Sequence, residues 1–138
     1  MSCQICNPSR ADLADEKTEM AVISCMLQAP ETQVDAALRI LKPDDFNFES
    51  IGLLFDIICN RHAKGEPIDV ISITAYIFDK NMTERIPVTL ISECLTASPN
   101  PSFTSHYADE VLAFSKRRQM VKIASDLAHA AITGALLS

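Results

Sequence analysis

The stretch Gly65-Glu66-Pro67-Ile68-Asp69-Val70-Ile71-Ser72-Ile73 contains the signals that end one helix and begin the next. Glycine adopts the left-handed backbone that closes many helices, so Gly65 is expected to cap the helix before it. Pro67 cannot continue that helix, because proline lacks a backbone N–H. Asp69 is a favoured N-cap, since its carboxylate accepts hydrogen bonds from the amides of a first helical turn. The stretch therefore predicts a sharp corner between two helices, the second over about 70–79.

Upstream of this corner, the run Lys42-Pro43-Asp44-Asp45-Phe46 predicts a turn that inserts Phe46 into the core. The residue before a proline avoids the helical region, so a helix expected over about 31–41 ends here. Apolar residues at three- and four-residue steps predict the next helix, over about 48–63. Adjacent acids after a proline are typical of a turn or a helix start. We therefore assign Asp44 and Asp45 to the turn, and not to acid–base chemistry.

The flanking sequence predicts three more helices. Apolar residues at helical spacing predict a first helix from residue 11 or 17 to Leu27, and Pro30 prevents its continuation. A fifth helix is expected over about 87–95, since proline is tolerated in a first turn. The pair Asn100-Pro101 supplies an N-cap and a first turn for the last and longest helix, expected over about 102–131 or beyond.

These elements predict an all-α protein of about six helices. Residues 1–14 are expected to form a flexible tail, because residues 1 to about 12 show no helical periodicity and contain Pro8. Residues 15–115 are expected to form a compact helical head, and residues 116–138 an arm that continues the last helix. The chain length suits one domain. The last helix is long enough to project from it, and its apolar residues predict that it starts a dimerisation arm.

Composition limits the classes of function. Hydrophobic residues make up 48% of the 138 residues and charged residues 22%, which is typical of a globular protein. The net charge of −6 disfavours direct binding to nucleic acid, because such binding uses clustered Lys and Arg to neutralise phosphates. Charges interrupt every apolar stretch well before the roughly 18 residues of a membrane span. Residues 1–10 do not resemble a secretory signal, so we expect a cytoplasmic protein without membrane contact.

The sequence contains no recognisable catalytic motif. A phosphate-binding loop needs a glycine directly before a lysine and a Ser or Thr, and none of Gly52, Gly65 and Gly134 precedes a lysine. A P-loop ATPase motor and a Gly-rich dinucleotide site are therefore excluded from this chain. The 3 histidines lie far apart in the sequence, and no Ser or Cys lies in a nucleophile-elbow context. We expect no catalytic residue and no cofactor.

The 5 cysteines do not predict a disulfide framework, because their number is odd and three of them fall in apolar helical patterns. Cys3-x-x-Cys6 and Cys59-x-x-His62 do have the spacing of zinc ligands, so one alternative is a structural zinc that links the tail to the third helix. We favour a free N-terminal cysteine pair and a half-buried Cys59 near the end of a helix, and assign no metal site.

The last helix carries two apolar rows. One is Tyr107, Phe114, Val121 and Ala128, and the other is Leu112, Met120, Ile123 and Leu127. Such a helix is either buried in its own domain or shared with another chain. Its second half follows the basic cluster Lys116-Arg117-Arg118, and we expect nothing later in the chain to cover it. We therefore predict an oligomerisation surface, and the alternative is a stripe that faces its own core. The candidate interaction residues are Arg117, Arg118, Met120, Val121, Ile123, Leu127 and Ala128.

Three signatures in this order resemble the N-terminal domain of DnaB-type replicative hexameric DNA helicases. They are the turn over 42–46, the corner over 65–73, and Tyr107-Ala108-Asp109-Glu110-Val111 in the last helix. The run over 19–27 is similar to the first helix of that family, and the resemblance extends over about 15–131. The residues that carry the signatures are Pro43, Asp44, Asp45, Phe46, Gly65, Pro67, Ile68, Asp69 and Tyr107.

The resemblance implies a domain that binds partners and performs no chemistry, within an ATP-dependent DNA helicase. In that family such domains pair through helical hairpins into a collar on the motor ring, and the collar recruits primase and communicates with loader proteins. The resemblance thus implies a homo-oligomer and contacts with primase and a helicase loader. Only the first helix of a hairpin is expected here, without a motor domain. Two origins stay open, a fragment of a helicase and a free-standing phage or plasmid protein that regulates a host helicase.

Overall fold

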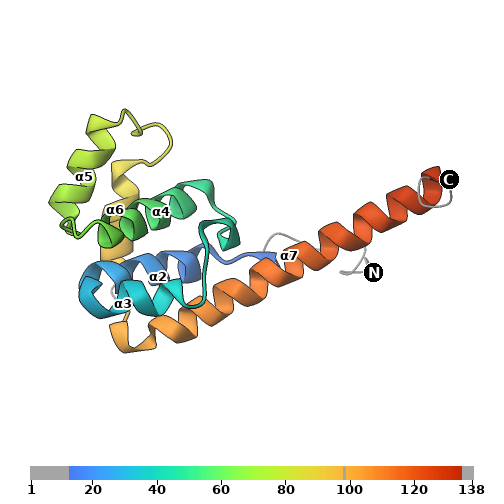
Figure 1. The fold of residues 1–138 in the computed structure, drawn as a ribbon, viewed down its shortest axis with the longest axis horizontal. Helices are drawn as coiled ribbons and strands as arrows, with labels where there is room; N and C mark the ends of the chain where they lie inside the picture. The colour runs from blue at the N-terminus through green and yellow to red at the C-terminus, as the bar shows by residue number, and fades with distance from the viewer. Residues whose placement is uncertain (1–12, 98, 135–138) are drawn as a thin grey trace.

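The computed structural model describes residues 13–97 and 99–134, which form six α-helices and two short 3₁₀ turns without a strand. In chain order the elements are α2 (Glu16–Gln28), α3 (Pro30–Leu38), η1 (Pro43–Asp45), α4 (Glu49–Ala63), α5 (Val70–Asp79), α6 (Val88–Ala97), η2 (Pro101–Phe103) and α7 (Thr104–Thr133). Helices α2 to α6 and the first half of α7 form a head, from which the rest of α7 projects (Figure 1). The predicted all-α class is confirmed. Of the predicted tail, residues 1–12 lie outside the described residues.

Helix α2 is the centre of the head, because it packs against α3, α4, α6 and α7. Every residue from Ala21 to Met26 is buried, including the polar Ser24. A helix that is surrounded on all sides has no solvent face, which explains why this run is apolar with one small polar exception. The core that surrounds it consists mainly of aliphatic side chains from all six helices and the loops between them.

The predicted corner between α4 and α5 is present. Gly65 has a φ of 70°, the left-handed conformation expected of a helix cap. The Asp69 carboxylate accepts a hydrogen bond of 2.8 Å from the backbone N–H of Ser72. Bonds from the backbone and hydroxyl of Ser72 lower the pKa of Asp69 below its usual value. Arg61 stabilises the loop between Gly65 and Asp69, because its Nε donates a hydrogen bond to the carbonyl oxygen of Pro67 at 2.9 Å.

The predicted turn over 42–46 also packs as expected. Phe46 is buried, and its ring centroid lies 4.7 Å from that of Phe55 on α4. A Cβ atom at Gly52 would lie 3.2 Å from the carbonyl oxygen of Pro43 and 3.3 Å from the Cβ of Phe46. Glycine at this position therefore allows the turn to approach the backbone of α4 closely.

Several helix boundaries differ from those predicted by one to three residues, and at two of them the hydrogen bonds show why. Helix α3 ends at Leu38, before the predicted residue 41, where the N–H of Ile40 makes a 3₁₀-type bond to the carbonyl oxygen of Ala37. The last α-helix begins at Thr104, since the expected Asn100 cap opens a 3₁₀ turn first. Both differences arise at helix ends, where short 3₁₀ bonds often replace α-helical ones.

A buried carboxylate joins α2 to the start of α4. The side chain of Glu19 is 2% exposed. Its two oxygens accept hydrogen bonds from the backbone N–H groups of Asn47, at 2.9 Å, and Phe48, at 3.2 Å. Burial raises the pKa of Glu19 above the ordinary value of 4.5, although the two hydrogen bonds act in the opposite direction. Glu19 thus satisfies amides at the entrance to α4 that would otherwise be desolvated without partners.

The raised pKa predicts a pH dependence of stability that Glu19→Gln removes. The folded protein binds this proton more tightly than the unfolded chain. The contribution of Glu19 to the free energy of unfolding is therefore fully present below the ordinary pKa and falls as pH rises through the raised one. Urea unfolding of both proteins between pH 4.5 and neutrality should show the wild type losing stability relative to the variant. A difference that stays constant with pH would contradict this, and Glu31→Gln, at an exposed site, is the matched control.

Candidate functional site: the arm of α7 and its joint with the head

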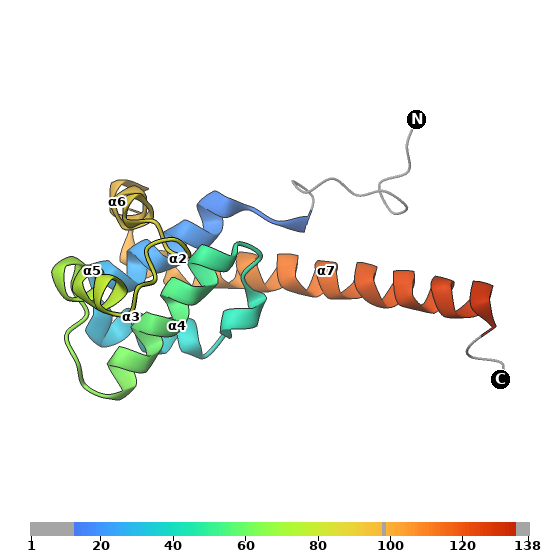
Figure 2. The same cartoon turned by 90° about the horizontal axis from the view of Figure 1, so that it is seen from above.

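The first half of α7 lies against the head along one stripe. Its buried residues are Thr104, Ala108, Val111 and Ser115, which recur at three- and four-residue steps. None of the described residues from 116 onward is buried, and we call this segment, 116–134, the arm. At 1.5 Å per residue, the part of the arm beyond Gln119 extends about 20 Å. Figures 1 and 2 show it running away from the head in two perpendicular views.

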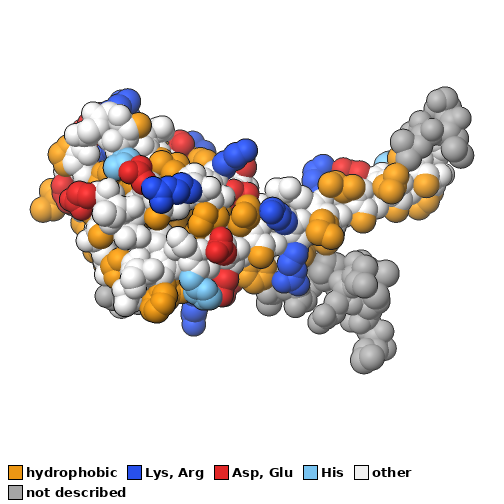
Figure 3. All heavy atoms as spheres, turned by 60° about the horizontal axis from the view of Figure 1, so that its bottom comes forward, with side chains coloured by type: hydrophobic (Ala, Val, Ile, Leu, Met, Phe, Trp, Pro, Cys, Tyr) orange, Lys and Arg blue, Asp and Glu red, His pale blue; other side chains and the backbone are white. Residues whose placement is uncertain are grey.

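The arm exposes large apolar side chains. Met120 is 67% exposed, Ile123 66%, Leu127 57% and Ile132 85%. Because successive residues of an α-helix are rotated by about 100°, Met120, Ile123 and Leu127 lie on one side of it. We call these three residues the apolar face. Figure 3 shows hydrophobic side chains following one another along the arm.

The apolar face points away from the protein's own head. When the buried stripe of α7 is continued along the arm at helical spacing, it meets Lys122, Asp126, His129 and Thr133. This continuation is polar, and Lys122 and Asp126 form an ion pair with an N–O distance of 3.0 Å. The apolar face lies on the other side of the helix, so the head that the arm leaves cannot cover it.

A cluster of hydrogen bonds fixes the root of the arm. Arg118 donates from Nη1 to the carbonyl oxygen of Leu13 at 2.7 Å and from Nη2 to that of Asp45 at 2.6 Å. The hydroxyl of Ser115 donates to the carboxylate of Asp45 at 2.8 Å. The other oxygen of that carboxylate accepts from the backbone N–H of Lys42 at 2.8 Å. We call this cluster the joint, because it connects the arm to the turn over 42–46 and to the start of the described chain.

Of the seven predicted interaction residues, one belongs to the joint and the other six lie outside it. Arg118 belongs to the joint, whereas Arg117 is exposed, with its guanidinium 5.6 Å from the ring centroid of Phe114. Val121 is half-buried and Ala128 exposed, beside the apolar face. Ile132 was missed by the sequence analysis because it belongs to neither apolar row, and no other local signal marks it. The signature residues Ile68 and Tyr107 are half-buried and pack against the core of the head.

The described residues contain no group of three or more His, Cys, Asp or Glu side chains placed to hold a metal ion. Cys3 and Cys6, which the zinc alternative requires, lie outside the described residues. His62 pairs with Asp35 at 3.1 Å. Burial raises the pKa of the Cys59 thiol to about 12.

Within the described part of the chain, no helix combines the length and apolarity needed to cross a membrane.

Two replicative DNA helicases are similar to this chain in sequence. Replicative DNA helicase DnaB of Geobacillus stearothermophilus is 28% identical to this chain over 113 residues. Replicative DNA helicase DnaC of Bacillus subtilis (strain 168) is 22% identical over 113 residues. Each alignment covers 81% of this chain but 25% of the relative, so the chain spans a quarter of the length of these curated relatives.

The fold is similar to that of a solved domain. The crystal structure of the N-terminal domain of DnaB helicase from Mycobacterium tuberculosis matches with a TM-score of 0.82 at 20% sequence identity, over 88% of each chain. At that identity the match establishes the fold. In sequence, residues 11–113 match the profile of the family described as DnaB-like helicase N terminal domain. That match covers most of the chain, and this protein therefore belongs to the family of DnaB-like helicase N-terminal domains.

Proposed function

We propose that this chain is the noncatalytic N-terminal domain of a replicative DNA helicase. In this role it mediates self-association into the helicase collar and contacts primase or a loader during DNA replication. The observation that carries the proposal is the apolar face of the arm, whose three side chains are exposed on the side of α7 turned away from the head. The names of the curated relatives, both replicative DNA helicases, support it.

A second copy of the arm fits this face. Full burial of one large aliphatic side chain contributes about 1.5–3 kcal/mol, so three of them give a helix pair a substantial driving force. Ala124 and Ala131 lie among them at helical spacing, and small residues allow another helix to approach closely. An isolated helix of this length is marginally stable in water. Packing against a second arm would stabilise it.

Replacing the apolar face with glutamines should abolish self-association. The variant Met120→Gln/Ile123→Gln/Leu127→Gln keeps good helix formers but removes the apolar surface. We expect the wild type to sediment as a dimer or larger species, and the variant to dissociate with a Kd raised at least about 100-fold. Circular dichroism should report unchanged helix content.

The matched control is Lys122→Gln/Ser125→Gln/His129→Gln, which changes the polar side of the same arm and should sediment like the wild type. A monomeric wild type at tens of micromolar, or equal dissociation of the two variants, would overturn the role of the apolar face.

Arg118 has a positioning role in this proposal. Its guanidinium joins two backbone carbonyl groups from different parts of the chain, which the ammonium of a lysine cannot do with the same planar geometry. The arm thereby leaves the head in one direction, and each copy presents its apolar face in the same orientation. Arg117, which is exposed, stays a candidate for contact with a partner.

Arg118→Met should lower the free energy of unfolding by about 1.5–3 kcal/mol, because it removes charge-assisted hydrogen bonds and keeps the aliphatic stem. Spin labels on the head and the arm should also show a broader distribution of distances. Arg117→Met, the neighbouring control, should change stability by less than about 0.5 kcal/mol and leave the distances unchanged. Equal effects of the two substitutions would contradict the positioning role.

Contact with primase or a loader is tested separately. We expect the chain to bind the primase or the helicase loader of its own organism in a sedimentation titration. Failure to bind either protein would contradict this half of the proposal and leave self-association unaffected.

A further inference from the structure

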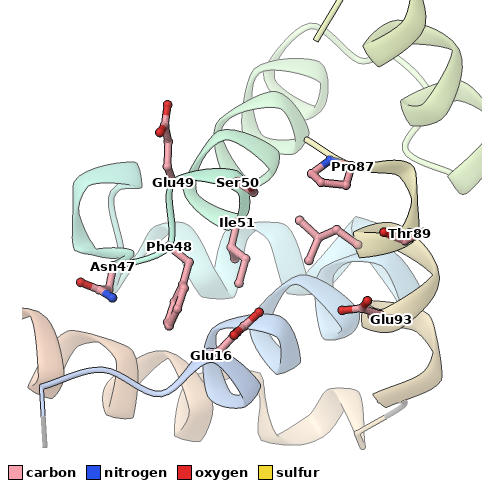
Figure 4. A pocket seen from close by; sticks show the side chains of 10 residues that line it. Glu16, Asn47, Phe48, Glu49, Ser50, Ile51, Pro87, Thr89 and Glu93 are labelled. Atoms are coloured by element: carbon pink, nitrogen blue, oxygen red, sulfur yellow. The ribbon is translucent and has the colours of Figure 1, made fainter. Parts of the chain in front are cut away.

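Two adjacent hollows lie beside the start of α4. The first, of about 310 Å³, has walls from α2, α4 and α6 (Figure 4). The second, of about 430 Å³, has walls from η1 and α4. The hollows are neighbours because Asn47 and Glu49 line both of them. All residues that line either hollow come from elements other than the arm.

Each hollow combines apolar and polar walls. Ile51 and Leu90 contribute apolar surface to the first, and Phe46 and Leu53 contribute it to the second. Each hollow has room for an apolar side chain of a partner. Asn47 lines both hollows and lies where they meet. A surface divided in this way suits two apolar side chains better than one large ligand.

The charged residues that line the hollows are all acidic. Glu16 and Glu93 lie in the first, Asp44 and Asp56 in the second, and Glu49 in both. Glu49 pairs with Arg85 at 3.0 Å, so the negative charge comes mainly from the other four side chains, which are exposed. In Figure 4 the carboxylates of Glu16, on α2, and Glu93, on α6, flank the first hollow from different helices.

Charge is also distributed unequally along the chain, with negative charge in the head and positive charge in the arm. Residues 116–138 contain four basic residues and one acidic residue, a net charge of +3, so residues 1–115 carry −9 of the total of −6. A strongly negative surface repels nucleic acid and attracts cationic protein segments. The complementary ligand for the hollows is therefore a basic peptide segment with exposed apolar side chains.

We propose that the two hollows are a docking surface for a basic segment of a partner protein, which places one apolar side chain in each hollow and Lys or Arg side chains against the surrounding carboxylates. The inference rests on the proposed function in that it names the surface through which the domain recruits a partner. The hollows and the apolar face share no residue.

The test uses a fluorescein-labelled peptide of lysine and leucine at helical spacing, with a glutamate–leucine peptide of the same pattern as its counterpart. Fluorescence anisotropy with the full chain should show binding of the lysine peptide only. Amide shifts in ¹⁵N spectra should concentrate at residues that line the hollows. Shifts concentrated on the arm, or equal binding of the two peptides, would overturn the proposal.

The decisive variant is Glu16→Gln/Asp44→Asn/Asp56→Asn/Glu93→Gln, which should raise the Kd of the lysine peptide by about tenfold. The control Glu31→Gln/Asp79→Asn/Glu84→Gln/Asp109→Asn removes four exposed charges elsewhere and should change the Kd by less than about twofold. Equal effects of the two variants on the Kd would mean that binding depends only on net charge, and would contradict the proposal. Thr89→Trp, which fills the first hollow, should weaken binding without any change in charge.

Sizing separates this inference from the proposed function. The decisive variant should keep the oligomeric state of the wild type, and the glutamine variant of the apolar face should still bind the lysine peptide. Loss of self-association in the decisive variant would assign the hollows to a contact between copies and overturn the docking role. A wild type that is monomeric and still binds the peptide at the hollows would contradict self-association alone.

Discussion

The turn between α3 and α4 is held by two carboxylates that have little contact with water. Glu19 is 2% exposed and Asp45 is 9% exposed. Burial of a charge is costly unless hydrogen bonds replace those of water, and both side chains accept backbone N–H groups of the same loop. Asp45 also accepts the hydroxyl of Ser115, on α7. These bonds connect α2, the start of α4 and α7 through one turn, and so help to hold the three helices relative to one another.

The direction of the arm follows from this arrangement. Ser115 is the last buried residue of α7, and Arg118 bonds to the same turn three residues later, so both help to set the direction in which the helix leaves the head. Beyond that point the regular rotation of an α-helix decides where each side chain points. The apolar face is therefore held outward by hydrogen bonds at the joint, and a partner meets a surface that is already oriented. Such preorganisation lowers the entropy cost of association.

Local signals in the sequence predicted much of the head and less of the joint. Gly65 and Asp69 each act on backbone groups within a few residues, so their roles and the bounds of α5 were predicted correctly. The bond from Asn47 to Glu19 joins residues 28 apart, and the bond from Arg118 to Asp45 joins residues 73 apart. Spacing carries no information on such pairs, and in the sequence Arg118 is one of three adjacent basic residues. The exposure of the arm likewise depends on where the head ends in space.

The head and the arm differ in net charge, which fits the proposal that each binds a different partner. The head is strongly negative and the arm is positive, so two arms that pair through their apolar faces bring like charges together. Lys116 and Arg117, at the root of the arm, are exposed, and salt screens their charges over about 8–10 Å. Contact between apolar side chains acts at short range and is not weakened by salt. Apolar contact can therefore exceed this repulsion along the arm. Two heads repel one another more strongly, because both are strongly negative. Binding of a basic partner to the head is therefore favoured over binding of a second copy. Under the proposed function, the arm therefore binds a second copy of the chain and the head binds a different protein.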